Sequence, residues 1–222
     1  AQLNALLAGE VVRWIDRPNG PDGEQRAAAL MITPVPRDDM WLACQDPHFQ
    51  GDPSVYELRY GFRPLDDADW FGLLDLPGPF EDRYWMVRSW NNHALAQATG
   101  GAAWEHPWVD IKGDLAVVRA AAAAGDIGPV TAERLDRALL APRNRGAFVA
   151  VALPGGGTIF GYHAMFSAAG NIPDWTVTRW AYSGLDRAMR SYEDRAVEVI
   201  PGHYTASHVP VIGGGGRPLA PR

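Results

Sequence analysis

The stretch between residues 171 and 199 constrains the fold most, because the sequence predicts one long amphipathic helix there. Its apolar residues recur every three or four positions from Val177 through Met189 toward the end of the stretch, and Pro201 follows. Gly184 interrupts the apolar face, which leaves room for a ligand or marks close packing. A helix with one apolar face must bury that face against another layer of the domain.

Short segments with strand periodicity precede this helix and supply that layer. Dense turn residues at 17–23 and at 154–157 predict two hairpins. The expected strands cover residues 10–15, 27–33, 56–60, 70–76, 83–90, 103–111, 147–153 and 158–166. The other expected helices cover residues 2–8, 34–44, 114–124 and 131–140, and a turn or bulge is expected at 91–93. The pattern predicts an α+β fold with an antiparallel sheet covered on one face by the long helix.

The domain organisation follows from the same pass along the chain. Residues 1–205 are expected to form a single domain that carries residues 114–141 as a helical insertion. Residues 206–222 form a tail rich in Gly and Pro, which we expect to be mobile from Gly213 onward. The absence of Met at the first position favours an exported or periplasmic protein weakly over a cytoplasmic one.

Composition excludes several classes of protein. The net charge of -6 argues against a nucleic-acid partner, because phosphate contacts require an excess of Lys and Arg. Cys44 is the only cysteine, so the chain forms no internal disulfide; we interpret it as a small buried apolar residue in a helix. No apolar stretch approaches the roughly 20 residues of a membrane-spanning helix.

Five segments, taken in order along the chain, resemble bacterial START-like domains of the SRPBCC superfamily. These are Leu6–Val12 (LLAGEVV), Met31–Trp41 (MITPVPRDDMW), Pro79–Val87 (PFEDRYWMV), Gly157–Tyr162 (GTIFGY) and Gly170–Trp175 (GNIPDW). The resemblance implies a helix-grip fold, in which a curved antiparallel sheet wraps around the C-terminal helix. It also implies a ligand tunnel between sheet and helix, and hence binding, with transfer as a further expectation, of a lipid or sterol-like molecule.

Aromatic and apolar residues on the late strands and on the inner helix face are the candidate ligand contacts, and ordinary core packing is the competing interpretation of each. The ligand-binding candidates are Trp90, Trp104, Phe148, Phe160, Tyr162, Trp180, Met189, Tyr192 and the polar anchor Arg83. A structural ion pair is the favoured alternative for Arg83, and the same alternative applies to Glu57, Arg59 and Arg88. We expect no cofactor, and transient contact with a membrane is compatible with loading and release of the ligand.

An enzyme of cyclase or aromatase type on the same fold is the alternative function, since fold does not determine function. It would require polar groups that converge in the cavity, for instance Arg83, Glu105 and His163. The Glu105–His106 pair could act as acid and base, but an ordinary pair on a strand is favoured. His203 and His208 lie in a Pro/Gly-rich segment without helical spacing, so no metal site is expected.

The insertion at 114–141 leaves further alternatives open. It could close over the tunnel as a lid, elaborate one edge of the fold without a role, or present a pair of helices to a partner protein. Loading and release would require opening near this insertion or near the C-terminal helix.

Overall fold

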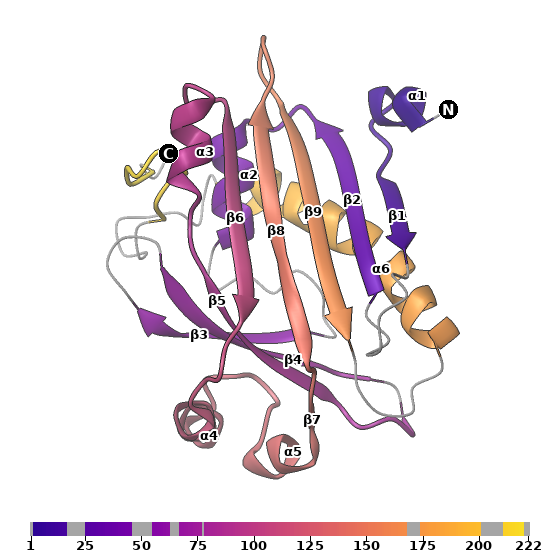
Figure 1. Cartoon of the computed structure of the whole chain (residues 1–222), viewed down its shortest axis with the longest axis vertical. Helices are drawn as coiled ribbons and strands as arrows, with labels where there is room; N and C mark the ends of the chain where they lie inside the picture. Colours follow the sequence, from indigo (N-terminus) through magenta and orange to yellow (C-terminus); the bar gives the residue numbers. More distant parts are fainter. Residues whose placement is uncertain are drawn as a thin grey trace.

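The computed structural model shows a curved antiparallel sheet that wraps around the long C-terminal helix, which confirms the expected fold class (Figure 1). The structure describes residues 2–16, 25–45, 55–62, 67–76, 78–167, 174–200 and 211–219. Within the described part, no helix is long and apolar enough to span a membrane.

Nine strands form one sheet in the order β1-β2-β9-β8-β6-β5-β4-β3, and the short β7 pairs with β5. Neighbours along this order are antiparallel, whereas β7 runs parallel to β5. The strands are β1 (Val12–Asp16), β2 (Gln25–Thr33), β3 (Val55–Phe62), β4 (Ala68–Leu74), β5 (Arg83–Ser89), β6 (Ala103–Asp110), β7 (Leu139–Leu140), β8 (Arg143–Ala152) and β9 (Thr158–Ser167). Both expected hairpins, β1–β2 and β8–β9, are confirmed.

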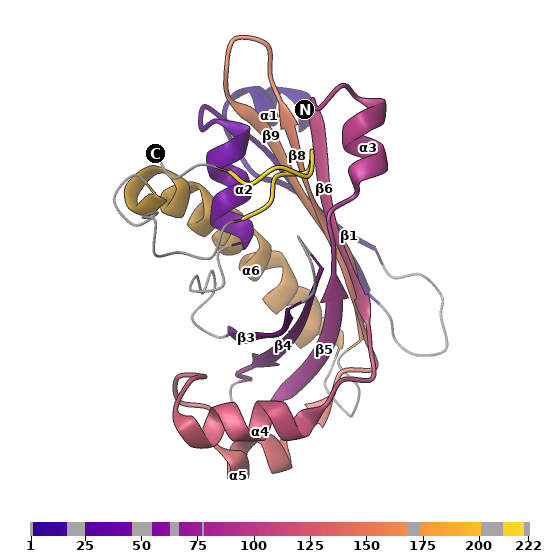
Figure 2. The same cartoon turned by 90° about the vertical axis from the view of Figure 1, so that its left-hand side faces the viewer.

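The helices cover two regions of the sheet. They are α1 (Gln2–Leu7), α2 (Arg37–Gln45), α3 (His93–Ala98), α4 (Leu115–Ala124), α5 (Ala132–Arg137) and α6 (Asp174–Asp194), which continues as a π-helical turn at Arg195–Val199. Figure 2 shows α2 and α6 on the concave side of the sheet and α4 with α5 beneath its lower end. The concave side is called the inner side below, and the opposite side is the outer side.

Side chains alternate between the two sides because successive residues of a strand point in opposite directions. On β3, Glu57 lines the inner side, whereas Tyr56, Leu58 and Tyr60 pack against the apolar cluster that includes α4 and α5. This cluster has its own buried residues, among them Val118 of α4. The curled strands β3, β4 and β5 therefore have an inner wall and a separately packed outer wall.

A second apolar cluster fixes α2 and α6 to the inner side of the sheet. Met31, Trp41 and Phe160 are fully buried there, and Met189 of α6 packs against them. The indole Nε1 of Trp41 donates a hydrogen bond to the carbonyl oxygen of Ile212 at 3.0 Å. Burying apolar surface in this way stabilises the fold by about 25 cal/mol per Å² removed from water.

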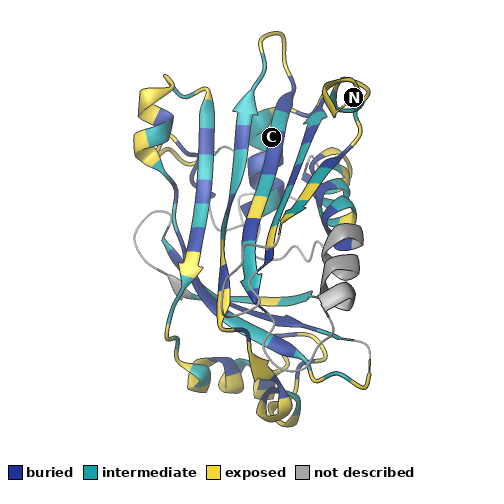
Figure 3. Cartoon of the chain, turned by 45° about the vertical axis from the view of Figure 1, so that its right-hand side comes forward, coloured by how far each residue is buried: buried dark blue, intermediate teal, exposed yellow. Residues whose placement is uncertain are grey.

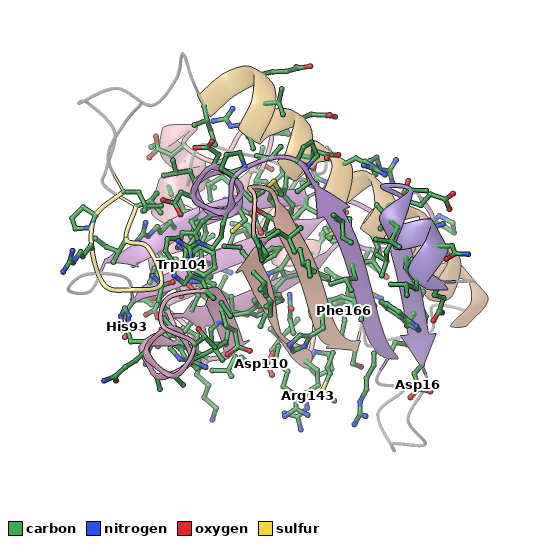
Figure 4. The ribbon with its side chains drawn as sticks, turned by 90° about the horizontal axis from the view of Figure 1, so that it is seen from above. Asp16, His93, Trp104, Asp110, Arg143 and Phe166 are labelled. Carbon is green, nitrogen blue, oxygen red and sulfur yellow. The ribbon has the colours of Figure 1, made fainter. Side chains whose placement is uncertain are left out.

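The C-terminal segment differs from the expected mobile tail. Residues 211–219 pack against the domain: Val211 belongs to the core, and the amide of Asn91 donates to the carbonyl of Ile212 at 2.8 Å. Figure 4 shows His93 and Trp104 beside this segment, and the His93 ring lies 2.9 Å from the carbonyl oxygen of Gly214. Its glycines allow close approach to Trp104, because a Cβ on Gly214 would lie 2.4 Å from that ring.

Two local predictions were wrong. The expected turn at 91–93 instead begins helix α3, and the Asn92 side chain caps it by accepting a hydrogen bond from the amide of Leu95 at 3.1 Å. The expected helix at 131–140 ends at Arg137, and Leu139–Leu140 pairs with β5. The backbone amide of Leu139 donates a hydrogen bond to the carbonyl oxygen of Asp82, which begins this pairing.

Candidate functional site

A partly open cavity of about 240 Å³ lies between the inner side of the sheet and helix α6. It is lined by Gln25, Ala27, Cys44, Val55, Glu57, Trp70, Trp85, Val87, Ser89, His106, Trp108, Asn144, Phe148, Tyr162, Ala164, Phe166, Gly184, Leu185, Ala188, Met189 and Tyr192. It suits one short chain or a small ring system.

Three tryptophans from neighbouring strands form one wall of the cavity. The indole Nε1 of Trp70 donates to Ser89 Oγ at 2.9 Å, and that of Trp108 donates to Asn144 Oδ1 at 2.9 Å. These hydrogen bonds fix both rings in orientation within the cavity wall. Trp85 lies against the backbone of Gly72, where an added Cβ would come within 2.2 Å of the ring. The wall therefore depends on a residue without a side chain at position 72.

Aromatic contacts continue from this wall to the helix. The Phe148 ring lies 5.3 Å from Trp108, 5.2 Å from Tyr162 and 5.3 Å from Tyr192 of α6, measured between ring centroids. Beside Tyr192 on α6, Ala188 and Gly184 also line the cavity. Ala188 and Gly184 leave space beside the helix that a larger side chain would fill. This agrees with the expectation that Gly184 leaves room for a ligand.

Glu57 brings a carboxyl group into this apolar cavity. The surface that its side chain exposes faces the cavity, and burial within the protein raises its pKa to about 7. Tyr162 lies close enough that the charge of Glu57 adds to the effect of burial, and both raise the pKa of the Tyr162 hydroxyl. At neutral pH the carboxyl group is therefore divided between its protonated and ionised forms.

His106 is a second titratable group in the wall. Its Nδ1 lies 2.8 Å from Asn91 Oδ1, which also accepts a hydrogen bond from Gln45 Nε2 at 3.2 Å. Oδ1 cannot donate, so Nδ1 carries the proton and donates. Burial, and secondarily the charge of Arg59, lower the pKa of His106 to about 3, so the ring is neutral and its Nε2 is an acceptor.

Cys44 lies on α2 as expected and lines the cavity. Burial raises the pKa of its thiol, which donates to the carbonyl of Trp41 at 3.4 Å, so it is protonated and poorly nucleophilic. Among the described residues, no group of three or more His, Cys, Asp and Glu side chains is placed to hold a metal ion. His203 and His208 lie outside the described residues.

The structure brings four of the candidate ligand-binding residues together in the cavity lining: Phe148, Tyr162, Met189 and Tyr192. Gly184 joins them there. Trp180 lies on α6, but its side chain is outside the described part of the chain.

The other candidates lie elsewhere. Phe160 is fully buried and stacks on Phe148 with a centroid distance of 6.0 Å, so it packs behind the lining. Trp104 is buried edge-on against Trp41 at 5.3 Å. Trp90 follows β5 and is absent from the lining, and its amide donates to the carbonyl of Pro107. Of these three residues, Phe160 supports the lining through its stacking on Phe148.

The polar anchor Arg83 also lies outside the lining. It is 1% exposed, and its Nη1 donates to the carbonyl oxygen of Glu81 at 2.5 Å. Its acidic neighbour Asp82 instead pairs with Arg134 of α5, with 2.5 Å between Nε and Oδ2. Arg88 forms the expected structural ion pair, 2.8 Å from Asp69.

The groups expected to converge in an enzyme do not meet. Glu105 and His106 are successive residues on β6 and point to opposite sides of the sheet, and Asn92 donates to Glu105 at 2.6 Å. His163 is exposed on the outer side, opposite the lining residue Tyr162. The acidic and basic groups that do share the cavity are Glu57 and His106.

Sequence reasoning missed the tryptophan wall and most of the polar lining. Trp70, Trp85 and Trp108 alternate with outer residues on β4, β5 and β6, so strand periodicity could have grouped them. What periodicity does not reveal is which of the two sides of each strand faces the helix. On β3 the apolar residues face outward toward the insertion, and the charged side lines the cavity.

The sequence matches no protein-family model, and no curated relative is significantly similar to it. The structure, in contrast, is similar to human STARD10, with 12% identity, a TM-score of 0.61, and coverage of 83% of this chain and 69% of that one. A STAR-related lipid transfer protein from Xanthomonas axonopodis gives 14% identity, a TM-score of 0.61, and coverage of 84% and 93%. Human StAR-related lipid transfer protein 5 gives 12% identity, a TM-score of 0.62, and coverage of 86% and 82%.

Proposed function

We propose that this chain, which has the helix-grip fold of START-related lipid transfer domains, binds one apolar small molecule reversibly in the cavity between its sheet and α6. The observation that carries the proposal is the cavity itself, which apolar and aromatic side chains line in the place where the fold separates sheet from helix. Burial of apolar ligand surface there gains about 25 cal/mol per Å², which supplies the driving force. The names of the similar structures support the same class of ligand.

The proposal extends to two further properties: the protein transfers its ligand between membranes or proteins, and the protein is exported from the cell. A carrier must release its ligand as well as bind it, so transient contact with a membrane surface fits the function. No covalent step is required of a carrier, and the cavity thiol is protonated, in agreement with such a role.

A substitution on α6 tests the proposal directly. Ala188→Phe places a ring in the cavity, so we expect affinity for the neutral fluorescent probe Nile red to fall about tenfold or more. Ala120→Phe is the matched control, because Ala120 is exposed on α4 and away from the cavity. Equal probe affinity in both variants, with both folded by circular dichroism, would contradict the proposed site.

A small-molecule enzyme of cyclase or aromatase type is the second candidate function. Glu57 favours it, because a carboxyl group with a pKa of about 7 is suited to proton transfer near neutral pH. Mass spectrometry of a ligand recovered after incubation distinguishes the two candidates. A carrier returns the ligand unchanged, whereas an enzyme returns a product of altered mass or structure.

A further inference from the structure

The charge of the cavity lining has one sign. Glu57 is an acid, and none of the residues that line the cavity in the described part of the chain is Lys or Arg. Arg59 is not part of the lining, although its Cζ lies 5.7 Å from the Trp70 ring and its charge contributes to the lowered pKa of His106. An anionic head group in this cavity would meet a carboxylate with no lining cation to neutralise it.

The fixed hydrogen bonds of the wall also leave acceptors available. The Nδ1–H of His106 donates its hydrogen bond to Asn91, so the other ring nitrogen, Nε2, is available as an acceptor. The side-chain oxygen of Gln25 is buried without a partner in the protein, and this residue also lines the cavity. The indole N–H groups of Trp70 and Trp108 already donate hydrogen bonds to Ser89 and Asn144, so neither N–H group is available to bind an anionic head group.

We infer that the cavity selects an apolar ligand that carries a hydrogen-bond-donating head group, a hydroxyl or an amine, which Glu57 accepts, and that it rejects a carboxylate head group. This inference rests on the proposed function and adds the chemical class of the ligand. Glu57 exposes its side chain within the lining of the cavity and has no hydrogen-bond partner among the described residues, so a ligand head group can donate to it directly. The cavity volume of about 240 Å³ limits the apolar part to a short chain or small ring.

Three decyl compounds that differ in the head group test the inference: 1-decanol, decylamine and decanoate. Each is titrated at pH 8 against Nile red bound to the protein. We expect decanoate to displace the probe about tenfold or more less effectively than decanol, because a hydrogen bond to a charged group contributes about 1.5–3 kcal/mol. Decanoate binding as tightly as decanol would overturn the inference.

Glu57→Gln keeps the size of the side chain and removes its charge. In this variant we expect the difference between decanol and decanoate to shrink to within about threefold. A selective loss of decylamine affinity would identify an amine as the preferred donor, and a selective loss of decanol affinity would identify a hydroxyl. Equal losses would show that Glu57 accepts from either group. Glu133→Gln, at an exposed acid on α5, is the matched control and should preserve the wild-type order.

The two levels of the proposal fail in different ways. If Nile red binds the wild-type protein and Ala188→Phe abolishes binding, the proposed function stands whatever the head-group order. If the probe binds but decanol and decanoate compete equally, the inference about Glu57 is wrong while the cavity remains a ligand site. If neither Nile red nor decanol, titrated directly by calorimetry, binds the wild-type protein, both are wrong. The wild-type comparison needs no variant, so the test does not depend on the folding of Glu57→Gln.

Discussion

Glu57 shows how a residue in an ordinary strand pattern acquires a special environment. Tyr56 and Leu58 on either side of it point to the outer cluster, so the alternation of the strand turns the carboxyl group inward. Burial in the cavity then raises its pKa, because the charged form loses its hydration. The sequence alone identified Glu57 as a polar candidate and favoured an ion pair, but the side that it faces depends on the position of the insertion.

The raised pKa of Glu57 predicts a pH dependence of stability. Its ordinary pKa is 4.5 and its pKa in the folded protein is about 7, so the folded state holds a proton that the unfolded state releases between these values. The free energy of unfolding of the wild-type protein should therefore fall relative to Glu57→Gln as pH rises from about 4.5 to about 7. Below and above this window the difference between the two proteins should be constant.

Urea unfolding of both proteins across this pH range measures the effect. His106, whose pKa is lowered to about 3, gives a slope of opposite sign below pH 6.5, but both proteins share it and it cancels in the difference. Parallel stability profiles for wild type and Glu57→Gln would show that the surrounding protein does not raise the pKa of this carboxyl group.

At the scale of elements, helices α4 and α5 explain why β3, β4 and β5 can curl over the cavity. Leu135 of α5 and Val118 of α4 pack with Phe71 and Met86 from the outer side of these strands. No residue of the expected insertion 114–141 lines the cavity. In Figure 3 the outward surfaces of α4 and α5 are exposed, whereas residues on their inner surfaces are buried. The insertion therefore supports the wall from behind and does not close over the cavity.

Leu135→Ala tests this role. Removing a buried leucine side chain should lower the free energy of unfolding by about 2–5 kcal/mol, while the affinity of the folded protein for Nile red should change less than about twofold. Leu140→Ala, at a residue that is 53% exposed, is the control and should change stability by less than about 0.5 kcal/mol. A large loss of probe affinity in folded Leu135→Ala would instead place the insertion at the ligand site.

Helices and strands were predictable where residues close in sequence determine the local structure. Turn residues fixed both hairpins, and helical periodicity fixed α6. The failures came from contacts distant in sequence: Leu139–Leu140 joins β5 by parallel pairing, and residues 211–219 find acceptor and donor partners on α2 and near α3. Trp104 illustrates the same limit, because the C-terminal segment and Trp41 cover a ring that periodicity alone assigns to the cavity side.

For the whole molecule, the sheet and α6 make a shell whose interior is not completely filled. Phe148, Tyr162 and Tyr192 line the space from both layers, while Phe160 closes the core beside it. The fold was predictable from the order of its elements and from a resemblance of short motifs. The position of the cavity between the sheet and the C-terminal helix was predictable from the sequence. Its charge and its volume were not, because they depend on tertiary packing between residues that are distant in sequence.

Native mass spectrometry of the purified protein, before and after incubation with a lipid extract, tests the central claim most directly. The account predicts one bound molecule per chain, of a mass that the cavity can hold, which organic solvent releases unchanged and which Ala188→Phe fails to retain. A clean ligand-free mass for the wild-type protein under all these conditions would contradict the claim that the chain is a carrier of an apolar small molecule.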